Sequence, residues 1–421
     1  MRPLLRALAA IGLLAAFVLP AAAEPGLRGA LDLRLRQEYL DGLYYWSPDQ
    51  PDRNWLRLRS RAGAAYSWGA SHEIEARACS EFRKITTPDT PLNYDEIILD
   101  RLLYRHRPSD WATLTLGRQD IAWDDGFLVM DGTPLDGSRS AYLNALRLEL
   151  TAEDPDLSLL EGFFAHNPAT DDLVLWDDDI ERRLTDADET AAALRARFAR
   201  QHQLALIWKR ERDPDHARPA LDAWTLGYRI ERTRGAVNVM GEVAIQYQDW
   251  SAPAKTSGLA WAMQTRLRRP LRDEIRMDLG VYAYSGRIGD QLAFRTPWGR
   301  WPKWSELMLY RLIGEGGVGA WANLAGPWIE LERRKGAVLF GFGAQIILAP
   351  EPRWEVRDML LRLCLERALA AGLSTQLLLE QMLGTGYDSV DYQPAFGSCC
   401  VRPIDAGGGA FLRWQLTYET N

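Results

Sequence analysis

The chain has no long hydrophobic run after its first 23 residues. A transmembrane helix needs about 18 or more consecutive apolar residues, and the mean hydropathy of the chain is negative. A protein that crosses a membrane with helices is therefore excluded. A transmembrane β-barrel is not excluded, because half of each strand faces a polar interior and the loops are polar.

Lysine, histidine and cysteine are also scarce. Only five lysines occur, so nearly all of the 50 basic residues are arginine, whose planar guanidinium suits carboxylate binding. The five histidines have no evident nucleophile as a partner, so we expect no enzyme. The four cysteines are Cys79, Cys364, Cys399 and Cys400, and they lack the spacing of a metal cluster. We expect no metal or cofactor, while a disulfide involving Cys399 and Cys400 stays open.

Charge and organisation narrow the class further. The net charge of −7 excludes a nucleic-acid binder of the usual basic kind. No internal repeat, low-complexity segment or linker interrupts the 421 residues, which indicates one large domain. The 17 tryptophans and 15 tyrosines are typical of the aromatic girdles of a membrane barrel.

The N-terminus has the features of a secretory signal peptide. Arg2 and Arg6 precede an apolar run over residues 7–19, and three alanines at 21–23 supply a cleavage site. No cysteine follows that could carry a lipid anchor. We therefore predict a signal peptide at residues 1–23 and a mature domain at residues 24–421 that lies in the outer membrane of a Gram-negative cell.

From Gly26 onward the sequence alternates apolar and polar residues with period two, which predicts β-strands throughout. In residues 223–233, for example, one face carries Trp224, Leu226, Tyr228 and Ile230, and the other carries Thr225, Gly227, Arg229 and Glu231. An arginine that faces lipid near the bilayer midplane costs about 2 to 4 kcal/mol. The charged faces must therefore point into a lumen.

Short and long connections alternate along the chain. Eight short turns, for example at residues 69–71, 234–235 and 270–272, alternate with nine longer loops, for example at residues 122–138 and 285–323. Eighteen strands result, in an all-β transmembrane antiparallel barrel with short periplasmic turns and long external loops. Strand parity is ambiguous over residues 97–105. It slips near Asp358, which predicts a bulge. Residues 304–313 are assigned to a loop, with a strand or short helix as the alternative.

Arginines at inward positions are the candidate lining of a path for an anionic solute. By parity they are Arg34, Arg36, Arg57, Arg59, Arg61, Arg77, Arg147, Arg195, Arg197, Arg229, Arg266, Arg268, Arg276 and Arg413. Inward carboxylates are also numerous, so many of these arginines are expected to pair with acids of the wall. The cluster expected to contact the solute is Arg34, Arg36, Arg57, Arg59 and Arg61, since neighbouring strands bring these five cations together.

One block of the sequence carries a family resemblance. Residues 116–119 read Leu-Gly-Arg-Gln, residues 136–139 read Asp-Gly-Ser-Arg and residues 144–147 read Asn-Ala-Leu-Arg. In this order, and with the arginine-rich segments 33–36 and 56–61, the chain resembles the alginate export family of outer-membrane barrels from Gly26 to its last strand. The block is also rich in aspartate, at Asp120, Asp124, Asp125, Asp131 and Asp136.

The resemblance implies a barrel of eighteen strands that lets alginate or a similar polyuronate leave the cell by diffusion through an arginine-rich lumen. Its partners would be the acidic polysaccharide, the lipid and lipopolysaccharide of the outer membrane, and periplasmic export proteins. The alternative is a porin for uptake of small anionic solutes. A third hypothesis is a non-conducting barrel that serves as an anchor or adhesin, with loop 285–323 as its plug.

Overall fold

The computed structural model describes residues 26–41, 52–87, 89, 93–131, 142–152, 157–169, 174–177, 187–213, 219–251, 255–299, 305–308, 321–351, 353–384 and 408–420. The predicted signal peptide, Cys399 and Cys400 lie outside these ranges. Within them, no helix is both long enough and apolar enough to cross a membrane. The predicted all-β class is confirmed.

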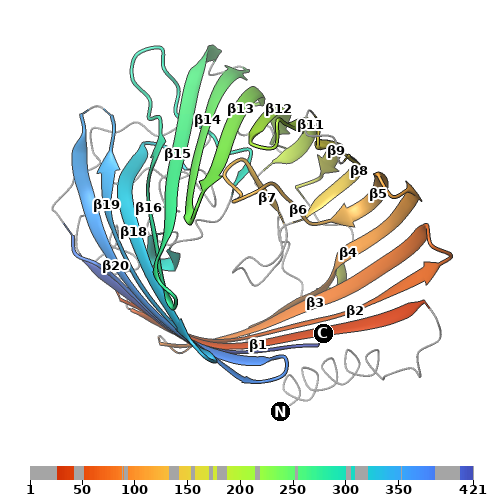
Figure 1. Cartoon of the computed structure of the whole chain (residues 1–421), viewed down its shortest axis with the longest axis horizontal. Coiled ribbons are helices and arrows are strands. Elements are labelled where there is room, and N and C mark those ends of the chain that lie inside the picture. Colours follow the sequence, from red (N-terminus) through yellow and green to blue (C-terminus); the bar gives the residue numbers. More distant parts are fainter. Residues whose placement is uncertain are drawn as a thin grey trace.

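Eighteen antiparallel strands form a closed barrel (Figure 1). In chain order around the ring they are β1 (Leu27–Asp41), β2 (Arg53–Trp68), β3 (His72–Thr87), β4 (Asn93–Ser109), β5 (Ala112–Gln119), β8 (Leu143–Thr151), β9 (Leu159–Asn167), β11 (Asp188–Phe198), β12 (His202–Arg212), β13 (Leu221–Arg234), β14 (Val237–Trp250), β15 (Thr256–Arg272), β16 (Ile275–Tyr284), β18 (Leu324–Lys335), β19 (Val338–Ala349), β20 (Glu355–Ala370), β21 (Leu373–Met382) and β22 (Gly409–Glu419). The last strand pairs with the first, from Asp32 opposite Glu419 to Asp41 opposite Ala410. This pairing leaves no open edge.

Four further strands are not members of the ring of eighteen. The short strand β10 (Val174–Asp177) pairs with the start of β4. The other three, β6 (Ile121–Ala122), β7 (Val129–Asp131) and β17 (Trp298–Gly299), form a separate small sheet inside the barrel, where Figure 1 shows β6 and β7 within the ring.

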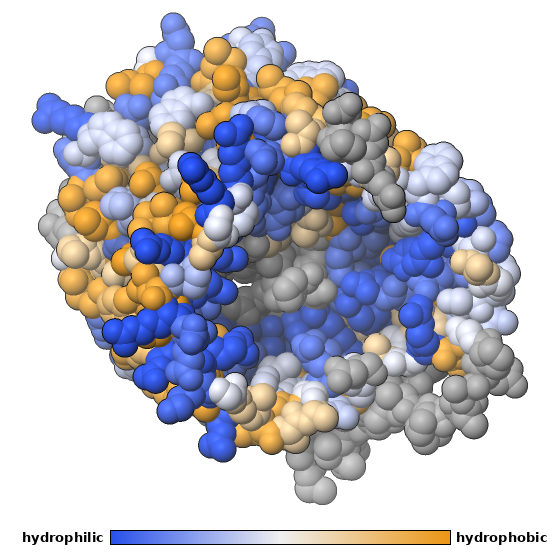
Figure 2. Space-filling view, in the orientation of Figure 1, coloured by the Kyte–Doolittle hydropathy of each residue, from blue (hydrophilic) through white to orange (hydrophobic). Residues whose placement is uncertain are grey.

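The strands expose apolar residues on the outside and bury polar residues on the inside. On β13, for example, Leu226 is 53% exposed and Arg229 is 5% exposed. Figure 2 shows hydrophobic residues over the outer flank and hydrophilic residues around the hollow. This is the lipid-facing and lumen-facing alternation expected of a membrane barrel.

Bulges account for the places where the alternation breaks. The register between β19 and β20 shifts between the pairs Ile347–Asp358 and Leu348–Val356, which confirms the predicted bulge. Strand β4 also contains a bulge, at Asp100. Arg77 of β3 lies opposite Arg101 and Ala78 lies opposite Leu99, so Asp100 has no opposite residue on β3. One extra residue changes the face of every residue that follows, which explains the ambiguous parity over residues 97–105.

The turn predicted at residues 270–272 is wrong. Strand β15 continues to Arg272, and the turn follows at residues 273–274. The register shifts between Pro270 and Arg272. Proline has no N–H to donate to a sheet and is tolerated at a bulge, so it does not end this strand.

Two segments between strands fold into the lumen. After Gln119 the chain leaves the wall, and residues 121–131 form a hairpin, here called the lumen hairpin, that contains β6 and β7. Strand β17, from the connection between β16 and β18, pairs in parallel with β7, Trp298 opposite Val129. In the same connection, residues 306–308 form one helical turn, within a region for which the sequence predicts a loop, with a strand or short helix as the alternative.

An apolar core therefore lies inside the barrel. Trp123, Phe127, Leu128 and Val129 of the lumen hairpin and Trp298 cluster with small inward residues of the wall, which include Ala165, Ala191, Ala193, Ala205, Ala244, Ala260 and Ala262. All of these side chains are at most 7% exposed. Alanine at these positions leaves room for the aromatic side chains of the inward segments, so part of the lumen is packed.

A charge on the outer face tests this orientation. Leu226 lies in the middle of β13, opposite Leu206 on β12 and Ile245 on β14. We expect Leu226→Arg to lower the free energy of unfolding by about 2 to 4 kcal/mol in denaturant titrations in lipid vesicles. The control is Leu369→Arg near the turn after β20, where the cost should be about 0 to 1 kcal/mol. Equal effects at the two positions would contradict the orientation.

Candidate functional site

A basic cavity of about 480 Å³ opens on the inner wall where β1, β2, β3 and β22 meet. Its basic residues are Arg34, Arg36, Arg59, Arg61 and Arg77. Its acids are Asp32 and Glu419, and Gln415, Thr417 and Thr420 add an amide and two hydroxyls. Among the residues that line the cavity, five guanidinium groups therefore outnumber two carboxylates.

The register of the sheet concentrates these charges. Arg34 lies directly opposite Arg59, and Arg36 lies directly opposite Arg57. Like charges that face each other across two strands are destabilising. Carboxylates or bound anions are therefore needed nearby to offset the repulsion.

Arg59 has buried donor groups that no described residue satisfies. Its Nη2 donates to both carboxylate oxygens of Asp32, at 3.2 and 3.0 Å. Its Nε and Nη1 are buried and have no hydrogen-bond partner among the described residues, and the residue is 5% exposed. A buried donor without a partner costs about 1 to 3 kcal/mol, which a carboxylate in the cavity can offset by accepting a hydrogen bond.

Arg61 and Arg77 share an acid of the wall. Asp100, the extra residue of the β4 bulge, accepts a hydrogen bond from Arg77 Nε at 2.8 Å and lies 3.4 Å from Arg61 Nε. Arg77 also lies 3.6 Å from Asp120. The bulge thus places one fully buried carboxylate between two cations and fixes both guanidinium groups beside the cavity.

Three arginines of the same region are held by wall or loop groups. Arg57 donates to Glu38 and to Glu81, at 3.0 Å each. Arg36 Nε donates to Gln415 at 2.6 Å. Arg413 pairs with Glu306 of the inward connection at 2.7 Å. Arg57 and Arg413 are not part of the cavity lining, whereas Arg36 is.

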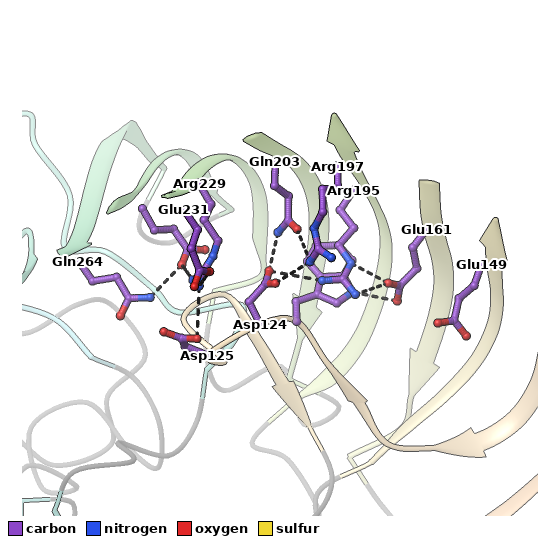
Figure 3. Close-up of polar contacts among 12 residues, drawn as sticks. Asp124, Asp125, Glu149, Glu161, Arg195, Arg197, Gln203, Arg229, Glu231 and Gln264 are labelled. Atoms are coloured by element: carbon purple, nitrogen blue, oxygen red, sulfur yellow. Dashed lines mark hydrogen bonds and ion pairs between the residues drawn. The ribbon is translucent and has the colours of Figure 1, made fainter. Parts of the chain in front are cut away.

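A second basic region lies on β11, β13 and β15. Figure 3 shows the tip of the lumen hairpin against it, with Asp124 near Arg195, Arg197 and Gln203. Asp124 lies 3.4 Å from Arg195 and 3.0 Å from Arg197. Asp125 lies 3.4 Å from Arg229 and 2.7 Å from Arg266.

The remaining predicted arginines pair with acids of the wall. Arg147 bonds Glu149 and Glu161 at 2.8 Å each. Arg268 and Arg276 both pair with Asp278, at 2.7 and 3.6 Å. The contacts of Arg147 with Glu161 and of Arg268 with Asp278 join neighbouring strands, and all four match the wall pairing that the sequence predicted.

The structure thus divides the fourteen predicted arginines. Of the expected contact cluster, four line the cavity and Arg57 does not, while Arg77 joins them from β3. That any of them lies on the path of a solute stays a prediction. Sequence analysis did not predict that Asp124 and Asp125 pair with arginines of β11, β13 and β15. The signal for it was the pair of aspartates before Gly126, in a turn flanked by Trp123 and Phe127.

No metal site is evident among the described residues. They contain no group of three or more histidine, cysteine, aspartate or glutamate side chains that could hold a metal ion. The features that are present, a closed barrel of eighteen strands, a charged interior and segments folded into the lumen, define the architecture of a transmembrane β-barrel of the outer-membrane type.

Solved structures of outer-membrane channels share this fold. OccK5 (OpdH) of Pseudomonas aeruginosa matches with a TM-score of 0.58 and 9% identity, over 94% of this chain and 99% of that one. OccAB1 of Acinetobacter baumannii matches with a TM-score of 0.56 and 9% identity, over 94% and 96%. OccK2 (OpdF) of P. aeruginosa, solved with glucuronate, matches with a TM-score of 0.55 and 11% identity, over 93% and 97%. No family model and no curated protein matches the chain.

Proposed function

We propose that this protein is an outer-membrane channel for the uptake of small anionic solutes, with no enzymatic activity of its own. The basic cavity carries the proposal, because five arginines and two acids line a space that also offers an amide and two hydroxyls. A wall of one dominant charge raises the local concentration of the opposite ion. Several exchangeable contacts allow a solute to enter and to leave.

The nature of the solute is supported by structures of similar fold. OpdK was solved with vanillate and OccK2 with glucuronate, and each of these ligands is a small carboxylate. A cavity of about 480 Å³ falls within the range of about 300 to 1,000 Å³ that holds small ligands. We therefore assign a small organic acid, with hydroxyl groups that Gln415, Thr417 and Thr420 can bind.

Export of a polyuronate, which the resemblance to the alginate export family implied, receives less support. A polymer needs a succession of exchangeable contacts along the whole lumen. The lumen hairpin instead pairs with the arginines of one wall and packs an apolar core inside the barrel. This interior favours a small solute over a polymer. After loss of residues 1–23, the mature barrel would lie in the outer membrane.

Planar-bilayer recording of the purified protein tests the proposal. We expect an anion-selective conductance that glucuronate reduces at millimolar concentration. Block by oligouronates at much lower concentration than by glucuronate would favour export of a polymer. Cation selectivity would contradict the proposal, and the absence of any conductance would favour a non-conducting anchor.

A further inference from the structure

The lumen hairpin places two carboxylates against the basic wall opposite the cavity. In addition to its arginine partners, Asp124 accepts a hydrogen bond from Gln203 at 2.6 Å (Figure 3). The 2.7 Å contact of Asp125 with Arg266 is also a hydrogen bond, which Arg266 donates. The side chains of Arg195 and Arg229 are 9% and 6% exposed. Each aspartate thus occupies the position that the carboxylate of a solute would take on this wall.

The hairpin reverses the sign of the charge imbalance in this region, because six acids face five arginines when the two aspartates are counted. Five arginines, at positions 147, 195, 197, 229 and 266, pair with four acids of the wall, Glu149, Glu161, Glu231 and Glu242, and with the two aspartates. Without the aspartates, five cations would face four anions. Among the described acids, Arg197 would lose Asp124, and Arg266 would keep Glu231 at 3.7 Å.

The hairpin keeps its place through contacts that do not depend on these charges. Trp123 donates to Glu161 at 3.0 Å and packs against Phe163, with ring centroids 5.6 Å apart. Phe127 packs against Tyr284 at 5.6 Å. Trp298 N–H donates to the carbonyl of Leu128 at 3.1 Å. Removing the two charges should therefore leave the hairpin on the same wall.

The backbone at the tip also restricts which substitutions are informative. Asp124 has a φ of 51°, in the left-handed region that asparagine and aspartate tolerate better than other residues with a side chain. Asparagine therefore preserves the backbone and most of the side-chain volume while it removes the charge.

We propose that Asp124 and Asp125 are specificity-determining residues: they are tethered anions that fill the anion positions of the wall formed by β11, β13 and β15. Mobile anions are then bound only on the opposite side, in the basic cavity on β1, β2 and β3. The inference deepens the proposed function, since it assumes that the mobile solute is an anion. It accounts for the difference between the two arginine-rich walls, since the arginines on β1, β2 and β3 line a cavity whereas Arg197 and Arg266 pair with the aspartates of the hairpin.

The double variant Asp124→Asn with Asp125→Asn tests the inference. We expect the permeability ratio of chloride to potassium, measured from reversal potentials across a KCl gradient, to rise on the order of threefold. We also expect a new binding site for glucuronate. Saturation-transfer NMR on the protein in detergent micelles measures this binding without any need for conduction. The new signal should disappear when Arg197→Gln and Arg266→Gln are added.

A second double variant controls for charge alone. Glu330→Gln with Glu332→Gln removes two acids from inward positions of β18, but Arg362 keeps Glu380 at 3.5 Å and Arg276 keeps Asp278 at 3.6 Å. We expect this control to gain no glucuronate site. A control that gains as much binding as the aspartate variant would overturn the inference, and so would an aspartate variant that gains none.

The two proposals fail in different ways. The wild-type channel decides the proposed function, through its ion selectivity and its own binding of glucuronate. The difference between the aspartate variant and the wild type decides the inference, because a gain of binding on β11 to β15 can be measured even where the cavity binds nothing.

Discussion

Replacing Arg59 with glutamine is expected to weaken the binding of glucuronate by about tenfold, since a hydrogen bond to a charged group contributes about 1.5 to 3 kcal/mol and 1.4 kcal/mol equals a factor of ten. Two nitrogens of this guanidinium have no hydrogen-bond partner in the described part of the chain, and the residue lines the basic cavity. Binding is measured by NMR titration in micelles and by the block of chloride current. The permeability ratio of chloride to potassium should fall at the same time.

Substitution by lysine separates charge from geometry at this position. Arg59→Lys keeps the positive field but loses the planar fork that binds a carboxylate through two hydrogen bonds. We expect its chloride selectivity to stay near that of the wild type, while its affinity for glucuronate falls. The matched control is Arg333→Gln, which removes a 55% exposed guanidinium paired with Glu274 near the turn after β18. If Arg59→Gln and Arg333→Gln bind glucuronate equally well, the cavity is not the site.

The strands and their orientation could be predicted because they follow from local chemistry. Alternation has a period of two residues, and the cost of a charge in lipid decides which face turns inward. The side chains of Arg195 and Arg229 are accordingly buried, and Leu194 and Leu226 are exposed on the other face. The bulge at Asp358 was visible for the same reason, since one extra residue reverses the alternation.

The basic cavity was predicted only in part, because it depends on the register between strands. Four of the five arginines in the expected cluster lie on β1 and β2 and line the cavity. Arg57 lies on the same face but is held by Glu38 and Glu81 from the strands on either side. Arg77 enters from β3 because the register places it opposite Gly63, which has no side chain.

The inward segments could not be placed from the sequence. Asp125 and Arg266 are separated by 141 residues, and no local pattern connects them. A partial signal existed in the alanines at inward positions, such as Ala191, Ala193 and Ala205. Small apolar residues at positions that should carry polar groups indicate that something packs against them, although they do not identify it.

Shortening the lumen hairpin should change conductance more than any single substitution. Replacing residues 123–129 with two glycines removes Trp123, Phe127 and Val129 from the interior core, together with both aspartates. We expect the single-channel conductance to rise by about twofold or more, because pore diameter limits the flow of ions. The double variant of Asp124 and Asp125 is the control, since it removes the same charge and keeps the bulk.

The barrel itself should survive this change, which makes the measurement interpretable. The eighteen strands close through β1 and β22, and β5 pairs with β8 from Ala112 opposite Leu150 to Gln119 opposite Leu143, so the wall is continuous without the hairpin. Among the described strands, β17 loses the pairing of Trp298 with Val129. An unchanged conductance in a folded variant would show that the hairpin does not narrow the path. A rise equal to that of the control would assign the effect to charge, because the removed aromatic side chains would then have no influence on ion flow.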